Sequence, residues 1–182
     1  MKVTIAPGRA KGQVFAPPSK SMAHRLLIGA ALSEGVSVIH HIDLSEDIKA
    51  TLGILEALGG KYFFEDGKVT MQGIGGKQFH CGKQLDCKES GSTLRFFIPL
   101  VLTDGRGYEF VGAKRLFERP LGIYEDICKE QGILFEKKEA ELFVEGQLKA
   151  GCYKVPGNIS SQFITGLLYA LPLLDADSVL EP

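Results

Sequence analysis

Residues 17–25 read PPSKSMAHR, and similar polar loops recur further along the chain. Two prolines stiffen the approach to a Ser-Lys-Ser turn, and apolar residues then recur at helical spacing. We expect a helix over residues 21–32, with Ser21 as its N-cap. A helix start offers unpaired backbone N–H groups and a partial positive charge. With Lys20 and Arg25 close by, it predicts a binding site for a phosphate or a carboxylate.

The composition is that of a globular domain with a core of its own. The chain has 182 residues, of which 45% are hydrophobic and 24% are charged. A net charge of −1 argues against general affinity for nucleic acid, so any basic site must be local. No apolar run approaches the roughly 20 residues of a membrane span, and the first residues lack the apolar segment of a signal peptide. We expect a cytoplasmic protein without a nucleic-acid or membrane partner.

The four cysteines show no C-x-x-C pair and no accompanying histidine pattern. We expect free thiols in a reducing cytoplasm. Cys81 and Cys87 are further apart than the ligands of most structural zinc sites, so no metal is expected.

Helix and strand patterns alternate along the chain, each bounded by glycine, proline or polar clusters. Asp66-Gly67 is a strong hairpin signal. Expected strands cover residues 3–6, 13–16, 36–39, 61–65, 68–72, 85–87, 108–111, 133–136, 141–144 and 152–155, and one begins within 177–182. Expected helices cover residues 21–32 and 93–102, and three more begin at Ser45, after Arg119-Pro120 and at Ser160.

These patterns form an internal repeat of strand, helix, strand, helix and hairpin. Arg25 and Arg95 are 70 positions apart, and Gly59 and Gly132 are 73 apart. A third copy stops after its first helix. Because a unit that does not complete its sheet leaves apolar surface uncovered, we expect the chain to be a fragment of a longer protein.

Each copy places a polar loop at the start of its first helix. The loops are Ser19-Lys20-Ser21, Ser90-Gly91-Ser92 and Ser160-Ser161-Gln162. Copies packed side by side would bring three helix starts together with Arg25 and Arg95. Such a cluster of hydroxyls, N–H groups and cations is suited to a small polyanion.

Arg119-Pro120 adds another candidate. Proline biases Arg119 toward an extended backbone, which can aim its guanidinium out of the next helix start. A guanidinium fork suits a carboxylate or a phosphate. The alternative is a surface arginine paired with Glu118 or Glu125, and the residues alone leave both possibilities open.

The histidines carry no clear chemistry. His24 lies within the first helix turn, where we expect it to be solvated. His40 and His41 end a strand, and alternation predicts one side chain inward and one outward.

Taken together and in order, these motifs resemble one enzyme family. Residues 18–21 with Arg25, residues 89–92 with Arg95, and residues 157–163 are similar to those of the 5-enolpyruvylshikimate-3-phosphate synthases, or 3-phosphoshikimate 1-carboxyvinyltransferases. Arg119-Pro120 fits the same pattern, and the resemblance runs along nearly the whole chain.

The resemblance implies an α/β (α+β) fold of repeated βαβαββ units around a pseudo-threefold axis, with the third unit incomplete here. We expect units at residues 13–76, 77–150 and 151–182. The family transfers the enolpyruvyl group of phosphoenolpyruvate to the 5-hydroxyl of shikimate 3-phosphate. This shikimate-pathway reaction releases phosphate by addition–elimination, uses no metal or organic cofactor, and is the target of glyphosate. A monomer is expected for the full-length protein.

By resemblance, Lys20 is the catalytic residue that contacts both substrates. Ser21, Arg25, Ser160 and Ser161 match ligands of shikimate 3-phosphate. Gly91 and Arg119 match ligands of phosphoenolpyruvate, and Gln162 bridges the two substrates.

Three departures from the family pattern stand out. Glu89 lies where many members have asparagine. The carboxy-terminal half, which supplies an aspartate proton acceptor and further basic ligands, is absent from these residues. In the family, residues corresponding to 1–18 pack toward that second domain. We therefore expect no turnover from this chain alone.

Two alternatives remain. The sister family, the UDP-N-acetylglucosamine enolpyruvyl transferases, usually has a cysteine shortly before the Arg-Pro, and residues 114–118 contain none. Fold likeness alone does not decide the substrate. The other alternative is a non-catalytic module that binds phosphate-bearing ligands.

Overall fold

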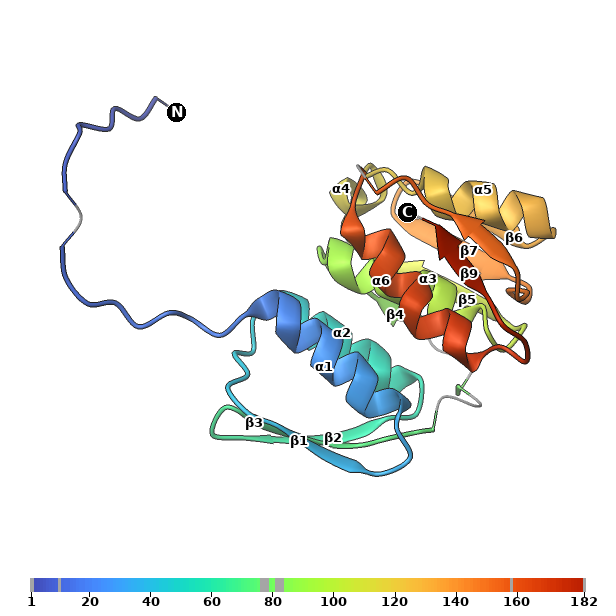
Figure 1. Cartoon of the computed structure of the whole chain (residues 1–182), viewed down its shortest axis with the longest axis horizontal. Coiled ribbons are helices and arrows are strands. Elements are labelled where there is room, and N and C mark those ends of the chain that lie inside the picture. The colour runs from blue at the N-terminus through green and yellow to red at the C-terminus, as the bar shows by residue number, and fades with distance from the viewer. Residues whose placement is uncertain (1, 10, 76–78, 81–83, 158, 182) are drawn as a thin grey trace.

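The computed structural model describes residues 2–9, 11–75, 79–80, 84–157 and 159–181, and shows an α/β fold with three small sheets and helices between them (Figure 1). The helices are α1 (Lys20–Leu32), α2 (Glu46–Ala57), α3 (Gly91–Val101), α4 (Lys114–Phe117), α5 (Gly122–Gln131), α6 (Ser161–Ala170) and the 3-10 turn η1 (Leu171–Leu173). The strands are β1 (Val36–Ile39), β2 (Lys61–Glu65), β3 (Lys68–Gln72), β4 (Leu85–Asp86), β5 (Gly107–Val111), β6 (Leu134–Lys137), β7 (Glu141–Glu145), β8 (Cys152–Lys154) and β9 (Val179–Glu181).

The first sheet has the order β1-β3-β2, and both of its pairings are antiparallel. The predicted hairpin at Asp66-Gly67 is confirmed. Both turn residues adopt positive φ angles, 46° and 71°, which match the twist of the flanking strands. Val69 and Met71 on β3 are buried, so this sheet packs its inner face against α1 and α2.

The second and third sheets each contain a parallel pair. The second has the order β4-β5-β7-β6, with Leu85 of β4 opposite Phe110 of β5, and the third pairs β8 with β9. The strand predicted to begin within residues 177–182 is therefore confirmed as β9.

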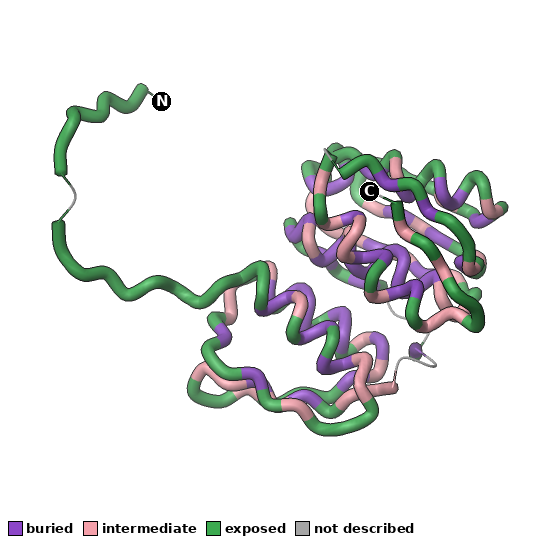
Figure 2. Tube along the Cα trace, viewed as in Figure 1, coloured by how far each residue is buried: buried purple, intermediate pink, exposed green. Residues whose placement is uncertain are grey.

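The two strands predicted before the first helix are not formed. Residues 2–9 and 11–19 contain no strand, and Val14 and Phe15 are 93% and 104% exposed. Figure 2 shows this segment exposed and leading away from the packed body. A single strand is unstable because its N–H and C=O groups need a partner strand, and residues 13–16 have none here.

The first helix begins earlier than predicted. Ser19, not Ser21, is the N-cap of α1, and its side chain accepts a hydrogen bond from Met22 N at 3.3 Å. Lys20 is therefore the first helical residue, directly after the extended Pro17-Pro18 approach. The predicted end at Leu32 is confirmed. The one-turn helix α4 was not predicted.

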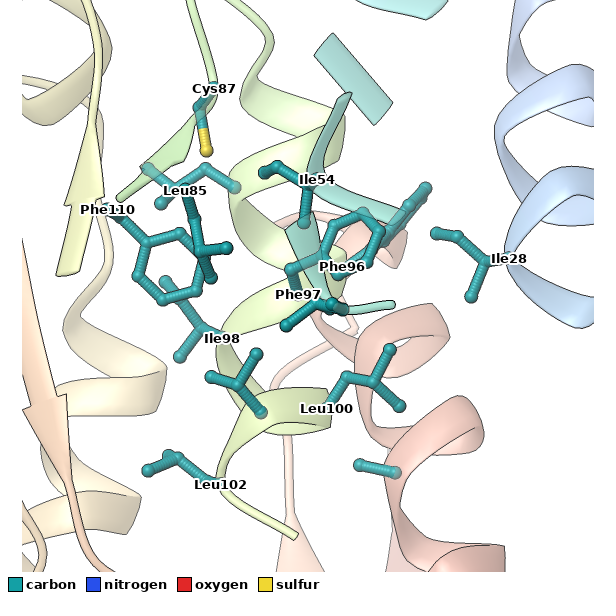
Figure 3. Close-up of a cluster of buried hydrophobic side chains, with 14 of the residues drawn as sticks. Ile28, Ile54, Leu85, Cys87, Phe96, Phe97, Ile98, Leu100, Leu102 and Phe110 are labelled. Carbon is teal, nitrogen blue, oxygen red and sulfur yellow. The ribbon is translucent and has the colours of Figure 1, made fainter. Parts of the chain in front are cut away.

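Helix α3 lies at the centre of the core. Nine of its 11 residues are buried, so it is apolar on nearly all sides. Phe96 and Phe97 of α3 belong to the same buried cluster as Ile28 of α1, Ile54 of α2 and Phe110 of β5 (Figure 3). Each such side chain contributes about 1.5–3 kcal/mol when fully buried. The core thus holds α3 against α1 and α2 and against strand β5.

Other predicted features have mixed outcomes. The prediction of one inward and one outward histidine is wrong: His40 and His41 are both exposed, because β1 ends at Ile39 and the strand alternation does not extend to them. Cys87 and Cys128 are buried free thiols, and burial raises the pKa of Cys128 to about 12. Cys81 lies outside the described residues. No helix among the described residues is long and apolar enough to cross a membrane.

Candidate functional site

Three helices begin on the same side of the molecule. In Figure 1, α1, α3 and α6 all start at the left and run to the right. Each of these helices follows one of the three polar loops predicted from the sequence. The side chains at these helix starts are connected by hydrogen bonds, so the structure brings together most of the predicted site residues.

Lys20 is the first residue of α1 and is paired with α2. Its Nζ donates to Asp47 Oδ2 at 2.6 Å, and the two side chains are 55% and 30% exposed. An ion pair this exposed contributes about 0–1 kcal/mol, so an anionic ligand can compete for the ammonium group. The sequence around Asp47 does not indicate this contact. Its position at the start of a neighbouring helix became meaningful only once α1 and α2 were seen to pack together.

Ser21 and Arg25 connect α1 to α6. Arg25 Nη1 donates to Ser21 Oγ at 2.6 Å, and Arg25 Nη2 donates to Thr165 Oγ1 at 3.1 Å. The Arg25 guanidinium carbon also lies 5.3 Å from the centre of the Phe96 ring, within range of a cation–π contact. These contacts hold the guanidinium at the joint between two helix starts. Thr165 was not predicted, because nothing in its local sequence points to Arg25.

At the start of α3, Gly91 allows Arg119 to approach closely. Ser90 is the N-cap, and its Oγ accepts from Thr93 N at 3.2 Å. A Cβ added to Gly91 would collide with Arg119 Nη1. The Arg119 guanidinium therefore lies close against the start of α3. Among described contacts, no ion pair of Arg119 with Glu118 or Glu125 is seen.

The start of α6 is linked to α3 through Gln162. Ser160 is the N-cap, and its Oγ accepts from Gln162 N at 3.3 Å. Gln162 Nε2 donates to Ser92 Oγ at 2.8 Å, and Gln162 Oε1 accepts from Arg95 Nη1 at 2.7 Å. Ser161 is exposed at the first position of the helix. Asn158, in the same motif, lies outside the described residues.

Arg95 is a half-buried cation of the cluster. Besides Gln162, it donates from Nη2 to Pro120 O at 3.2 Å, and its guanidinium lies 5.1 Å from the Phe163 ring centre. Burial, together with the nearby positive charge of Arg119, lowers the pKa of Arg95. Both effects disfavour the charged form, so an anion placed between the two guanidinium groups would be stabilised by them.

Tyr124 holds the backbone beneath this cluster. Its buried hydroxyl donates to Arg95 O at 2.7 Å and is also 3.2 Å from Phe163 O. Burial raises the pKa of Tyr124 well above its usual value, so the group is a neutral donor. The sequence showed Tyr124 only as one residue of a helix, and its role depends on how three helices pack.

Two pockets lie near these residues. One, of about 370 Å³, is lined by Glu89, Arg115, Leu116, Glu118 and Arg119. The other, of about 540 Å³, lies between α5 and β8 and contains none of the eight predicted site residues. The first pocket is therefore the one continuous with the Arg119 side of the cluster. Glu89 lines this pocket together with two arginines, Arg115 and Arg119.

Comparisons with known proteins agree on one family. The model of the EPSP synthase (3-phosphoshikimate 1-carboxyvinyltransferase) family matches residues 5–181. A relative named 3-phosphoshikimate 1-carboxyvinyltransferase from Clostridium perfringens is 48% identical over 179 residues, covering 97% of this chain and 42% of the relative. One from Clostridium kluyveri, with the same name, is 47% identical over 182 residues, with 98% and 42% covered.

The fold is also that of a solved enzyme. EPSP synthase from Acinetobacter baumannii superimposes with a TM-score of 0.80 at 24% identity, covering 94% of this chain and 40% of the other. The chain thus spans about 42% of the length of the curated relatives it matches.

Proposed function

Because the chain belongs to the EPSP synthase family, we propose that it forms the shikimate 3-phosphate side of an enolpyruvyl transferase. The complete reaction would transfer the enolpyruvyl group of phosphoenolpyruvate to the 5-hydroxyl of shikimate 3-phosphate and release phosphate. The observation that carries this proposal is the junction of three helix starts, joined by Arg25–Thr165 and Gln162–Ser92 hydrogen bonds. Phosphate-bearing ligands are suited to such a junction.

Shikimate 3-phosphate is assigned to the starts of α1 and α6. Ser160 and Ser161 would hold its phosphate with their hydroxyls and with the N–H groups of the α6 start. Arg25, already fixed between the two helices, would bind a negative group of the same ligand. Each charge-assisted hydrogen bond contributes about 1.5–3 kcal/mol, so three of them reach the free energy of micromolar binding only at the upper end of this range.

Phosphoenolpyruvate is assigned to the start of α3 and to Arg119. The bare backbone of Gly91 lets the Arg119 guanidinium lie against the start of α3. Gln162, near the start of α6, contacts Ser92 and Arg95 of α3. It therefore lies between the two proposed subsites.

Lys20 is assigned the catalytic role. The 5-hydroxyl oxygen adds to the enol carbon of phosphoenolpyruvate and loses its proton, while the methylene carbon takes a proton and becomes a methyl group. The tetrahedral intermediate then expels phosphate as the methyl group gives up a proton, which restores the enol double bond. Lys20, Arg25 and the helix starts would stabilise the negative charge of that intermediate. Holding the hydroxyl against the enol carbon would supply proximity. Lys20 must leave Asp47, or share its protons with the ligand, to do so.

The organisation of the parent protein is also part of the proposal. We assign residues 19–182 to the substrate-binding domain and residues 1–18 to packing against a second domain. That second domain is the proposed partner for turnover. We also propose that the full-length protein is a monomer. A cytoplasmic location is proposed as well, because free thiols suit a reducing compartment.

A calorimetric titration of shikimate 3-phosphate into the 182-residue chain tests the proposal. We expect saturable binding that shikimate, which lacks the phosphate, does not reproduce. Ser161→Ala and Arg25→Ala should each weaken binding about tenfold to a hundredfold, because each removes a charge-assisted contact. Lys61→Ala, on the exposed strand β2, is the matched control and should bind as the wild type does.

Absence of binding at millimolar ligand, with a normal circular dichroism spectrum, would contradict the assignment of the junction. Binding that persists while turnover stays absent, even with the second domain supplied, would favour a non-catalytic module instead.

A further inference from the structure

The core contains one set of buried polar side chains apart from its tyrosines and cysteines. Among the described residues these are His24, Thr51, Ser90 and Thr93, each at most 1% exposed. They come from α1, α2, the N-cap of α3, and α3 itself. The expectation that His24 is solvated is therefore wrong, because its place on α1 faces α2 and α3 rather than water.

The four side chains form one connected line. His24 Nδ1 lies 2.8 Å from Thr51 Oγ1, and Thr51 Oγ1 lies 2.8 Å from Thr93 Oγ1. Thr93 Oγ1 donates to Ser90 Oγ at 2.6 Å. The line runs from the first turn of α1, through α2, to the N-cap of α3. It ends one residue before Gly91 and begins one residue before Arg25.

The direction of the hydrogen bonds can be derived. If Thr93 donates to Ser90, then Thr51 donates to Thr93, and His24 Nδ1–H donates to Thr51. His24 Nε2 is then a bare acceptor, and it has no hydrogen-bond partner among the described residues. Burial lowers the pKa of His24 to about 4, which agrees with a neutral ring. The hydroxyls of Thr51 and Thr93 are thus each used as both donor and acceptor, and the Ser90 hydroxyl accepts from Thr93.

Stability alone does not require this line. Replacing paired polar groups by apolar groups of the same shape is often nearly neutral, and Val has the shape of Thr. Hydrogen bonds are directional, however, and a connected buried network favours one arrangement of the elements that it joins. Here the joined elements are the two helices whose starts carry Lys20 and Gly91. Asp47, one turn before Thr51 on the same face of α2, reaches Lys20 as well.

We propose that Thr51 is a positioning residue for the anion site, holding the start of α1 in register with the start of α3 through His24 and Thr93. The inference rests on the proposed function for its ligand. Thr51 is 0% exposed and touches no ligand itself. Because α3 is joined to α6 through Ser92 and Gln162, the same register also sets the distance between the α1 and α6 contacts to shikimate 3-phosphate.

Calorimetry on three variants of the 182-residue chain tests the proposal. Thr51→Val breaks the line without changing shape and should weaken shikimate 3-phosphate binding about five- to tenfold. Thr51→Ser keeps the hydroxyl and should bind within twofold of the wild type. Thr70→Val, on strand β3, removes a threonine hydroxyl outside the line and should bind as the wild type does. Thr51→Ala gives the same comparison if the valine variant does not fold.

The inference is overturned if Thr51→Val binds as tightly as the wild type, or if Thr51→Ser is as weak as Thr51→Val. The second result would show a packing role instead of a hydroxyl role.

A ligand-free measurement separates this inference from the proposed function. In ¹⁵N NMR spectra, His24 should show a protonated Nδ1 in the wild type and in Thr51→Ser. Amide signals of Ser21 and Ser92, at the two helix starts, should both move in Thr51→Val and stay in place in Thr70→Val. If the wild type binds no shikimate 3-phosphate, the proposed function fails, and these amide shifts still decide the positioning role. Shifts confined to residues around Thr51 would overturn it.

Discussion

Gly91 illustrates how one missing side chain shapes the site. Its position is the first residue of α3, its φ is ordinary, and the space that a Cβ would need is taken by the end of the Arg119 side chain. A flexible guanidinium can move aside at little cost, so the fold does not depend on this glycine. The close approach of Arg119 to the start of α3 does depend on this glycine.

Gly91→Ala should therefore leave the protein folded and displace Arg119. The melting temperature should stay the same or rise slightly, because alanine is the better helix former by about 1 kcal/mol. The NMR signal of Arg119 Nε–H should move, and affinity for phosphoenolpyruvate should fall about tenfold through loss of a charge-assisted contact. Gly122→Ala, at the first position of α5 with open space around it, is the matched control. An unchanged Arg119 signal in Gly91→Ala would refute this account.

His24 makes stability depend on pH in a direction that can be stated. Burial lowers its pKa from 6.5 in the unfolded chain to about 4 in the folded chain. The unfolded state therefore binds the proton first as pH falls. The stabilisation is fully present above pH 6.5 and is lost between 6.5 and 4, with a total on the order of 3 kcal/mol.

Urea unfolding at pH 7 and at pH 4.5 should show this loss in the wild type. His24→Gln should have a lower stability at pH 7 and a smaller drop toward pH 4.5, whereas His40→Gln, at an exposed position, should keep the slope of the wild type. Equal slopes for His24→Gln and the wild type would show that this ring does not govern the acid side.

At the scale of elements, the packing of α3 on α6 depends on Gly166. A Cβ there would lie 2.6 Å from Arg95 O and would also collide with the Tyr124 hydroxyl. Since backbone atoms give way less easily than side-chain ends, Gly166→Ala should destabilise the protein by about 1–3 kcal/mol, as overpacked cores do.

Gly29→Ala is the matched comparison, because Gly29 is also a helix-interior glycine and has nothing within 4 Å of its added Cβ. It should stabilise the protein by about 0.5–1 kcal/mol. Thermal unfolding of both variants measures the difference, and a Gly166→Ala protein as stable as Gly29→Ala would mean that α3 and α6 can separate freely.

Elements with a local signal were predictable from the sequence. The hairpin at Asp66-Gly67 follows from turn chemistry, and α5 ends at Gly132, whose φ of 70° suits a helix C-cap. The strand predicted at residues 13–16 contains Val14 and Phe15, which favour strands, but its formation depends on a partner strand, which is a matter of tertiary structure. The N-cap of α1 was misplaced by two residues because Ser19 and Ser21 are equally good caps in isolation.

The candidate site divides in the same way. Lys20, Gly91 and Gln162 lie in loops that the internal repeat marks as equivalent. Asp47, Thr51 and Thr165 gained roles only from contacts between helices that are distant in sequence. No periodicity or spacing in one sequence reports such contacts.

At the scale of the whole molecule, a net charge of −1 accompanies a local cluster of cations at three helix starts. The basic character of the site is therefore a product of folding. The chain covers about 42% of the length of its curated relatives.

We expect that the 182 residues alone bind substrate without turnover. With shikimate 3-phosphate and phosphoenolpyruvate present, phosphate release should equal the rate without protein. Release above that rate that is abolished by Lys20→Ala would contradict this expectation, and release unaffected by Lys20→Ala would indicate a contaminating phosphatase.

The starts of α1, α3 and α6 are proposed to form one junction, in which α1 and α6 hold shikimate 3-phosphate and Gln162 links this subsite to Ser92 on α3. Amide chemical-shift mapping during a titration of ¹⁵N-labelled chain with this ligand tests it most directly. We expect concerted, saturable shifts of the amide signals of Ser21, Ser92, Ser160 and Ser161, with one shared dissociation constant. Shifts centred instead on the pocket between α5 and β8, around Ile127 and Tyr153, would contradict it.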